Sequence, residues 1–308
     1  MTGFGYNVNG FGAHASRGVA IDASAASSAN LQTIFNNAVA DSWASGTPKT
    51  YDIGAIDMGI LTIPSGMGGT LEINIASGGT VRGVGGAANT SPGAGGAGGA
   101  AGAAGGAGNA AGAAISVAST GVTINVLGSL QGGGGGGGAG GGAGGGGQGR
   151  TTSYYSGIFC QDQGCPGQCT AGCSITGSGC GPDDESYYRQ NCGYYVYHTG
   201  GAGGAGGNSG KGQGYVSAAG SGASGSGGSS ASNAGTGGTG GAGGAGGAFG
   251  AAGSAGSAGA AGANSYANGG AGGAGGAAGA AGRAVLFVGI SAYTIIGTDS
   301  GTISGAYN

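Results

Sequence analysis

The clearest pattern in the chain is an alternation of apolar and small polar residues that recurs in three separate segments. Residues 61–83 (LTIPSGMGGTLEINIASGGTVRG), 114–132 (AISVASTGVTINVLGSLQG) and 284–305 (AVLFVGISAYTIIGTDSGTISG) each contain short stretches with apolar or β-branched residues at every second position. Each segment closes with an apolar residue, one polar residue and glycine. A period of two is typical of half-buried strands, so we expect short β-strands in all three segments.

A helical period occurs once, in residues 24–45 (SAASSANLQTIFNNAVADSWAS). It predicts an amphipathic α-helix, with Ser27 or Ser28 as a candidate N-cap. Two interpretations of the apolar stripe stay open: it packs on its own domain, or it attaches the chain to a partner subunit or a symmetry mate. The stripe consists of Leu31, Ile34, Phe35, Ala38 and Val39.

Glycine makes up 91 of the 308 residues, and many glycines recur with a strict period of three. A polyproline-II-type helix has three residues per turn, so a glycine row at this spacing lets backbones approach closely along one side. Collagen fills such triplets with proline, whereas this chain has five prolines in all. We therefore predict packed polyglycine-II helices whose N–H and C=O groups bond to neighbouring helices. The rows run from Gly93 to Gly108, Gly201 to Gly210, Gly235 to Gly262 and Gly270 to Gly282.

These patterns together predict a mostly irregular and β fold. It consists of packed polyglycine-II helices with short β-strands, one N-terminal α-helix and a disulfide-rich insert. The bulky Phe249 lies within the longest glycine row, so we expect a turn there that folds the row into shorter helices. Four regions follow: an N-terminal attachment region at 1–60, β segments with the first glycine tracts at 61–149, an insert at 150–199, and further tracts with a closing β segment at 200–308.

Composition and charge exclude several classes of protein. Leu, Ile, Val and Phe are scarce, which argues against an ordinary apolar core. Charged residues make up 6% of the chain and the net charge is −3, which disfavours a nucleic-acid partner. The first twenty residues lack the apolar stretch of a standard secretion signal, and no segment approaches the roughly 20 apolar residues of a membrane span. We therefore expect no membrane insertion.

Candidate catalytic groups are few. His14 and His198 are the only histidines, and neither stands in a nucleophile–base arrangement or a metalloprotease spacing. The adjacent Asp183, Asp184 and Glu185 indicate a solvated acidic loop or a cation contact rather than two carboxylates across a cleft. We expect neither an enzyme nor a cofactor.

The insert at 150–199 interrupts the glycine pattern and contains every cysteine of the chain. An even number of clustered cysteines in a small segment favours disulfides, with 15 pairings that the sequence does not rank. Zinc is disfavoured because no CxxC pair occurs, and free thiols are the third alternative. Assembly in a reducing cytoplasm would delay the bonds until release. The disulfide candidates are Cys160, Cys165, Cys169, Cys173, Cys180 and Cys192.

Tyrosine is also concentrated in this insert, which holds more than half of the 13 tyrosines. Tyrosine offers a large, rigid, amphipathic contact surface at low entropic cost, so recognition loops favour it. The alternative is that these side chains cover a disulfide framework. The receptor-binding candidates are Tyr154, Tyr155, Asp183, Asp184, Tyr187, Tyr188, Tyr194, Tyr195 and Tyr197.

The segments TVRGVGGAANTSPGAGGAGG, GVTINVLGSLQGGGGGGGAGGG and GTISGAYN resemble the glycine-rich adhesins at the tips of T-even-type phage tail fibres. The resemblance covers roughly residues 60–150 and 200–305. It implies a polyglycine-II sandwich whose distal loops bind a bacterial outer-membrane protein or a surface glycan. Carried over, it makes the insert at 150–199 the recognition loop and residues 212–221 and 263–269 minor candidates.

The resemblance further implies a virion protein of the phage tail, assembled in the host cytoplasm, with other tail or fibre proteins as partners. The six cysteines and the first 60 or so residues depart from the family, so a single copy on a fibre and a homotrimeric spike both stay open. Two other classes use similar repeats. A glycine-repeat antifreeze-type protein would present a flat, regular face, and a mycobacterial Gly-Ala-repeat protein would begin with a helical targeting domain.

Overall fold

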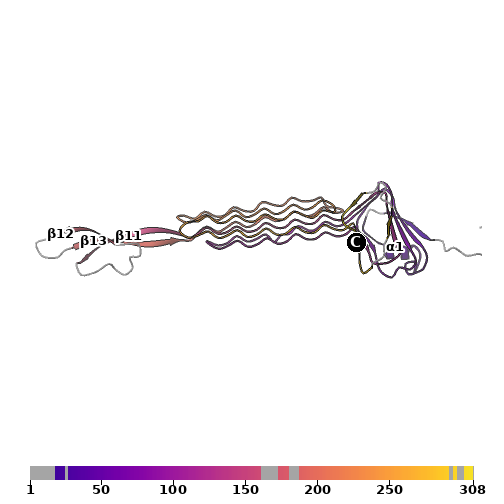
Figure 1. Ribbon diagram of the computed structural model, residues 1–308, viewed down its shortest axis with the longest axis horizontal. Helices are drawn as coiled ribbons and strands as arrows, with labels where there is room; N and C mark the ends of the chain where they lie inside the picture. Colours follow the sequence, from indigo (N-terminus) through magenta and orange to yellow (C-terminus); the bar gives the residue numbers. More distant parts are fainter. Residues whose placement is uncertain are drawn as a thin grey trace, which may run out of the picture.

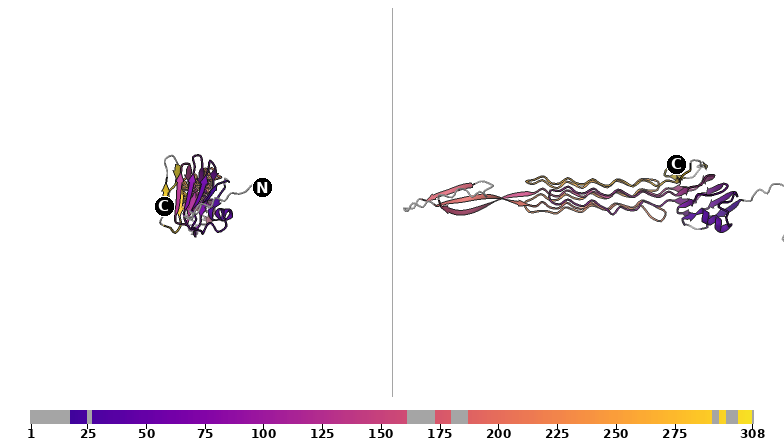
Figure 2. Two further views of the ribbon diagram at one scale, coloured as in Figure 1. Left: turned by 90° about the vertical axis from the view of Figure 1, so that its right-hand side faces the viewer. Right: turned by 90° about the horizontal axis from the view of Figure 1, so that it is seen from below.

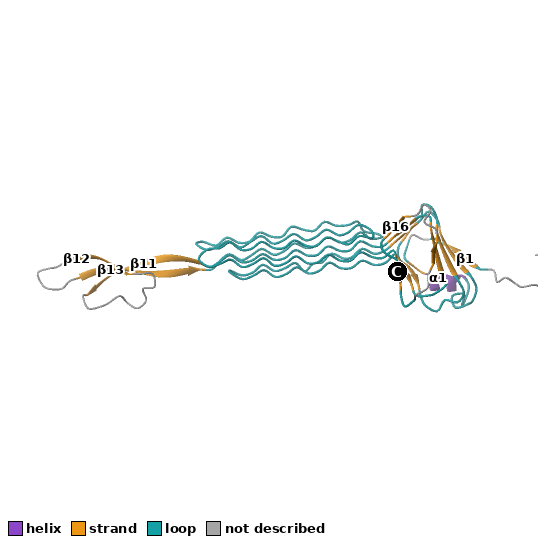
Figure 3. Ribbon diagram, viewed as in Figure 1, coloured by secondary structure: helices purple, strands orange, loops and turns teal. Residues whose placement is uncertain are grey.

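The computed structural model describes residues 18–24, 27–160, 173–179, 187–290, 294–296 and 302–307, and in 154–193 and 294–296 it describes the backbone only. Three parts follow one another along the long axis (Figure 1). We call them the head, the bundle and the tip sheet. The head contains α1 (Leu31–Ala38) and strands from both the N-terminal and the C-terminal parts of the chain (Figure 3). The bundle contains the glycine tracts, and the tip sheet lies at the end of the bundle away from the head.

The head is a coil of parallel strands with three sides. Its sheets have the strand orders β2-β5-β8-β14, β1-β3-β6-β9-β15 and β4-β7-β10-β16. From β2 onward the chain visits the three sheets in turn, and four such turns stack on one another. The strands are β1 Val19–Asp22, β2 Ala29–Asn30, β3 Lys49–Ile53, β4 Asp57–Met58, β5 Leu61–Ile63, β6 Leu71–Ile75, β7 Thr80–Arg82, β8 Ile115–Val117, β9 Val122–Val126, β10 Ser129–Gln131, β14 Val285–Phe287, β15 Thr294–Ile296 and β16 Thr302–Ser304.

The core of the head results from in-register stacking of the alternating apolar residues. On one side Tyr51, Ile73 and Ile124 are register partners in neighbouring strands, and all three are buried. On the next side Leu61 and Val285 both pair with Ile115, again fully buried. Because successive residues of a strand point to opposite faces, every second residue of each strand reaches this interior.

The one helix in the described residues is α1, Leu31–Ala38, and it is shorter than the predicted stretch at 24–45. Asn30, rather than Ser27 or Ser28, caps it, because its side chain accepts a hydrogen bond from the Thr33 N–H at 3.3 Å. Leu31 and Phe35 are buried, and the Phe35 ring lies 6.2 Å from the ring of the buried Trp43. The helix therefore packs on its own head.

The bundle is inserted into the coil at one corner. Between β4 and β5 the chain turns this corner within two residues, whereas residues 83–114 and 132–284 leave from the same corner in the next two turns. They form extended segments that run side by side away from the head (Figures 1 and 2). Phe249 lies in a turn between two of these segments, as predicted, and its ring lies under the Arg82 guanidinium at 5.2 Å.

Segment 133–147 is the axis of the bundle, and each of its N–H groups donates to a neighbouring segment. N–H groups that are three residues apart in the axial segment donate to the same neighbouring segment. Gly133 and Gly136 donate to residues of segment 100–112, Gly134 to segment 200–213, and Gly135 to segment 251–263. Its carbonyl oxygens accept hydrogen bonds with the same three-residue spacing from segments 84–99, 235–247 and 269–282. Six neighbours therefore surround the axis.

The predicted fold class is wrong. The regular structure of the described residues consists of parallel-strand sheets, one antiparallel sheet and a single short helix, an α/β-like arrangement rather than a mostly irregular chain of packed polyglycine-II helices. The expectation that the chain lacks an apolar core also fails. Four stacked turns bury the same few apolar positions repeatedly, so scarce Leu, Ile and Val suffice for a core in the head.

Candidate recognition site

The tip sheet is formed by the predicted insert. Its strands are β11 Gly149–Cys160, β12 Cys173–Gly179 and β13 Tyr187–His198, in the order β11-β13-β12. The pairing is antiparallel, and Gly149 lies opposite His198 at the bundle while Cys160 lies opposite Tyr187 at the far end. This sheet extends the bundle at the end opposite the head (Figure 1).

A cluster of aromatic rings around one arginine lies where the tip sheet joins the bundle. The Arg150 guanidinium is 4.0 Å from the centroid of the Tyr195 ring and 3.9 Å from that of Tyr266. The Tyr197 ring lies 6.5 Å from Tyr195 and 6.0 Å from Tyr266. We call these four residues the Arg150 cluster. A cation at such distances over a ring face is attracted by the ring quadrupole.

The cluster draws on three separate stretches of chain. Arg150 is on β11 and lies directly opposite Tyr197 of β13. Tyr195 is also on β13, two residues before Tyr197. Residues two apart in a strand share a face, so the Tyr195 and Tyr197 rings lie on the same side of β13. Tyr266 comes from the loop between bundle segments 251–263 and 269–282. The cluster thus fastens the tip sheet to the bundle.

Much of the cluster is open to solvent. Tyr197 and Tyr266 keep 52% and 53% of their surface exposed. Exposed phenol rings offer flat apolar faces with a hydroxyl that both donates and accepts hydrogen bonds, and the guanidinium adds a positive charge. This combination suits a polar ligand with flat or weakly apolar faces, such as a sugar ring or a protein side chain.

Only part of the predicted site lies in described side chains. Tyr195 and Tyr197 join the Arg150 cluster and Tyr194 lies beside it on β13. Tyr154, Tyr155, Tyr187 and Tyr188 lie on β11 and β13 as backbone positions, as do Cys160 on β11, Cys173 on β12 and Cys192 on β13. Asp183, Asp184, Cys165, Cys169 and Cys180 fall outside the described residues.

Sequence reasoning missed Arg150 and ranked Tyr266 only through its loop at 263–269. A usable signal existed for Tyr266, because it is an aromatic residue alone between two glycine rows. The other minor candidate, 212–221, lies at the head end: the Gly212 N–H donates to Gly86 and the Tyr215 N–H to Gly83. His198 shares a 2.8 Å hydrogen bond with the Thr151 hydroxyl.

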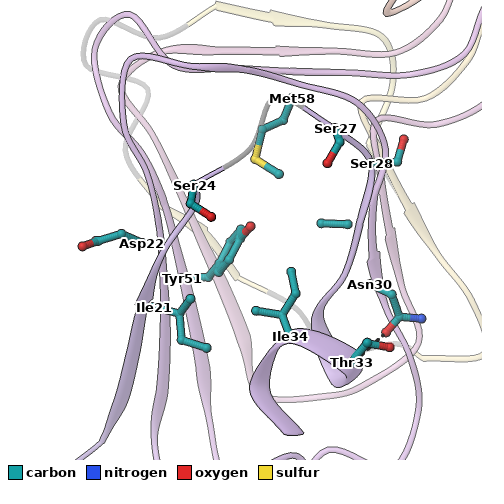
Figure 4. A pocket seen from close by; sticks show the side chains of 11 residues that line it. Ile21, Asp22, Ser24, Ser27, Ser28, Asn30, Thr33, Ile34, Tyr51 and Met58 are labelled. Atoms are coloured by element: carbon teal, nitrogen blue, oxygen red, sulfur yellow. Dashed lines mark hydrogen bonds between the residues drawn. The ribbon is translucent and has the colours of Figure 1, made fainter. Parts of the chain in front are cut away.

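A separate cavity of about 400 Å³ lies in the first turn of the head (Figure 4). Its lining combines the apolar side chains of Ile21, Ile34 and Met58 with the hydroxyls of Ser24, Ser27 and Ser28. Tyr51 also lines it, and burial raises the pKa of Tyr51 above its ordinary value of 10.0. Nothing in its lining assigns it a ligand.

The raised pKa of Tyr51 predicts an alkaline effect on stability. A group with a higher pKa in the folded state contributes stability that is present below the unfolded value and is lost as the pH rises above it. Phenylalanine does not ionise, so Tyr51→Phe should not lose stability through deprotonation at position 51. We therefore expect the free energy of unfolding of wild type to fall relative to that of the variant between about pH 9 and about pH 11. Urea unfolding of both chains at both pH values measures this difference in the free energy of unfolding.

Burial lowers the pKa of Lys49, so the contribution of Lys49 to the pH dependence of stability has the opposite sign. Comparing wild type with Tyr51→Phe at each pH cancels the Lys49 contribution, since both chains contain it. A constant difference between the two chains from neutral to alkaline pH would contradict the prediction.

Comparison with protein-family models, with curated proteins and with solved structures found no match. Within the described ranges, no helix is long and apolar enough to cross a membrane. In the same part of the chain, no group of three or more His, Cys, Asp or Glu is placed to hold a metal ion.

Proposed function

We propose that this chain is a recognition protein that presents a Tyr-rich tip to a cell surface from the end of a rigid rod. The observation that carries the proposal is the separation of parts: the head lies at one end of the bundle, and the tip sheet lies at the other (Figures 1 and 3). The Arg150 cluster lies where the tip sheet joins the bundle. A head that attaches and a tip that binds need this separation.

The bundle is suited to hold the tip at a distance. Each N–H of its axial segment bonds to one of three neighbours, and each of these three bonds in turn to two of the other three neighbours around the axis. Bending such a rod would break many hydrogen bonds at once, and each unmade buried bond costs about 1–3 kcal/mol. A rigid support limits the entropy lost when the tip binds.

The resemblance to phage tail-fibre adhesins suggests the setting. In that setting the protein is a virion component of a phage tail, the head joins other tail or fibre proteins, and the tip binds a bacterial outer-membrane protein or a surface glycan during adsorption. The alternative is a glycine-repeat structural or antifreeze-type protein that binds no receptor. The two differ in whether the exposed tyrosines of the tip matter.

The proposal predicts that the exposed tyrosines of the Arg150 cluster control adsorption to cells. The double variant Tyr197→Ala/Tyr266→Ala should adsorb about tenfold less or worse, because exposed aromatic anchors dominate protein interfaces. Fluorescently labelled full-length protein is incubated with a panel of bacterial strains, and bound label is counted. Tyr307→Ala is the matched control, because Tyr307 is also 53% exposed but belongs to the head end.

The outcomes of the adsorption assay distinguish the two proposed functions. Loss in the double variant with normal binding by Tyr307→Ala supports recognition at the Arg150 cluster. Equal loss in both variants would mean that the effect is not specific to the tip. Wild-type protein that adsorbs to no strain would favour the structural alternative.

A further inference from the structure

We infer that Cys173 and Cys192 form a disulfide bond that joins β12 to β13 in the tip sheet. Cys173 is the first residue of β12 and lies directly opposite Cys192 in the antiparallel register. Directly opposite residues of an antiparallel pair share one face, with Cα atoms about 4.5–5.5 Å apart. A disulfide spans Cα separations of about 4.4–6.8 Å. The register therefore meets the geometric requirement.

The third cysteine in the described strands is placed too far away to compete. Cys160 lies opposite Tyr187, five positions along β13 from Cys192. At about 3.4 Å per residue this separation is about 17 Å, well beyond the reach of a disulfide. Cys173 is remote from Cys160 for the same reason, since it sits at the level of Cys192. The six cysteines minus this pair leave four for other bonds.

The bond would act where the tip sheet is weakest. β12 has seven residues, pairs only with β13, and its register shifts between Thr176 and Ser178. A short edge strand with an interrupted ladder has few hydrogen bonds to hold it. A covalent link at its first residue closes the loop from 173 to 192 and restricts the unfolded ensemble.

The chemistry needs an oxidant of the disulfide class, such as oxidised glutathione. One cysteine thiolate attacks a sulfur of the small disulfide, forms a mixed disulfide and releases one small thiolate. The second cysteine thiolate then attacks the protein sulfur and releases the other. Two protein thiols are oxidised and one small disulfide is reduced to two thiols. The inference does not depend on receptor binding.

The test counts free thiols and, by intact mass, glutathione adducts in the full-length protein after treatment with oxidised glutathione. In the variant Cys160→Ser/Cys165→Ser/Cys169→Ser/Cys180→Ser, only Cys173 and Cys192 remain, and we expect neither a free thiol nor a glutathione adduct. The matched control Cys165→Ser/Cys169→Ser/Cys173→Ser/Cys180→Ser keeps Cys160 and Cys192, and we expect each of them to remain a free thiol or a glutathione adduct. Free thiols or adducts in the first variant, or neither of them in the control, would overturn the inference.

A measurement on the wild-type chain covers the case in which the serine variants fold poorly. The oxidised protein is alkylated, digested without reduction, and the cross-linked peptides are sequenced by fragmentation mass spectrometry. Trypsin cleaves after Arg189 and so separates the two cysteines into different peptides. A link between Cys173 and Cys192 supports the inference, and any other partner for Cys192, or a free Cys192, overturns it.

Discussion

Replacement of Gly140 by alanine is expected to destabilise the bundle by about 3 kcal/mol or more. Gly140 lies in the axial segment, and a Cβ added there would lie 2.0 Å from the Gly241 carbonyl oxygen. The Gly140 N–H also donates to Gly207, and the Gly93 N–H donates to the Gly140 carbonyl. No flexible side chain can move aside, because the colliding atoms are backbone. Relief of the clash must therefore separate hydrogen-bonded segments.

The matched control is Gly227→Ala in the outer segment 220–229 of the same bundle. A Cβ at Gly227 would have no atom within 4 Å. We expect a change within about 0.5 kcal/mol, since surface substitutions of this kind are nearly neutral. Hydrogen exchange of peptides from 133–147 measures the effect, because local opening exposes these amides. Equal protection in the two variants would show that position 140 tolerates a side chain.

The glycine pattern holds more information about the bundle than its period. In the axial segment nearly every position is glycine, and it bonds to six neighbours. Segment 200–213 has glycine in two of three positions over much of its length and four neighbours, whereas 251–263 has one in three and three neighbours. A closely approaching backbone leaves little room for a Cβ. The number of glycines in each group of three residues therefore indicates how many sides of a segment are covered by other segments. Crowding could therefore be predicted from sequence.

The head was only partly predictable. Alternation identified strands in three segments, and their mutual likeness was visible. That likeness arises because Val81 and Leu130 occupy equivalent places in successive turns and are register partners. What the sequence did not show is that segments separated by long glycine tracts return to the same coil. Pairing in register across such distances depends on the bundle bringing the chain back, which no local pattern encodes.

The site was predictable in composition and not in geometry. The concentration of tyrosine identified the insert, and Tyr195 and Tyr197 do lie in the Arg150 cluster. Arg150 precedes the tyrosines at the edge of the insert, and Tyr266 follows them by about seventy positions. Their meeting depends on antiparallel pairing at the start of β11 and on a loop of the bundle. Contacts of this kind between distant segments leave no trace in spacing.

Replacement of Lys49 by methionine is expected to destabilise the head by about 3 kcal/mol. Lys49 is 1% exposed, and burial lowers its pKa. Its ammonium group donates three hydrogen bonds, to the carbonyl oxygens of Ser45 at 3.0 Å, Thr47 at 2.9 Å and Gly68 at 2.7 Å. Methionine keeps the length of the side chain but donates nothing, so three acceptors lose their partner. Their lost bonds exceed the gain from removing a buried charge.

Trp43 makes this prediction measurable in the head alone. It is the only tryptophan of the chain, it is buried, and its indole N–H donates to the Ser65 carbonyl oxygen at 3.2 Å. Its fluorescence during urea unfolding therefore follows the head and not the bundle. Lys211→Met is the matched control, because Lys211 is exposed on the bundle and should leave the transition unchanged. A Lys49→Met transition at the wild-type urea midpoint would show that desolvation of the ammonium group offsets its three hydrogen bonds, and Lys49 would then contribute no net stability to the head.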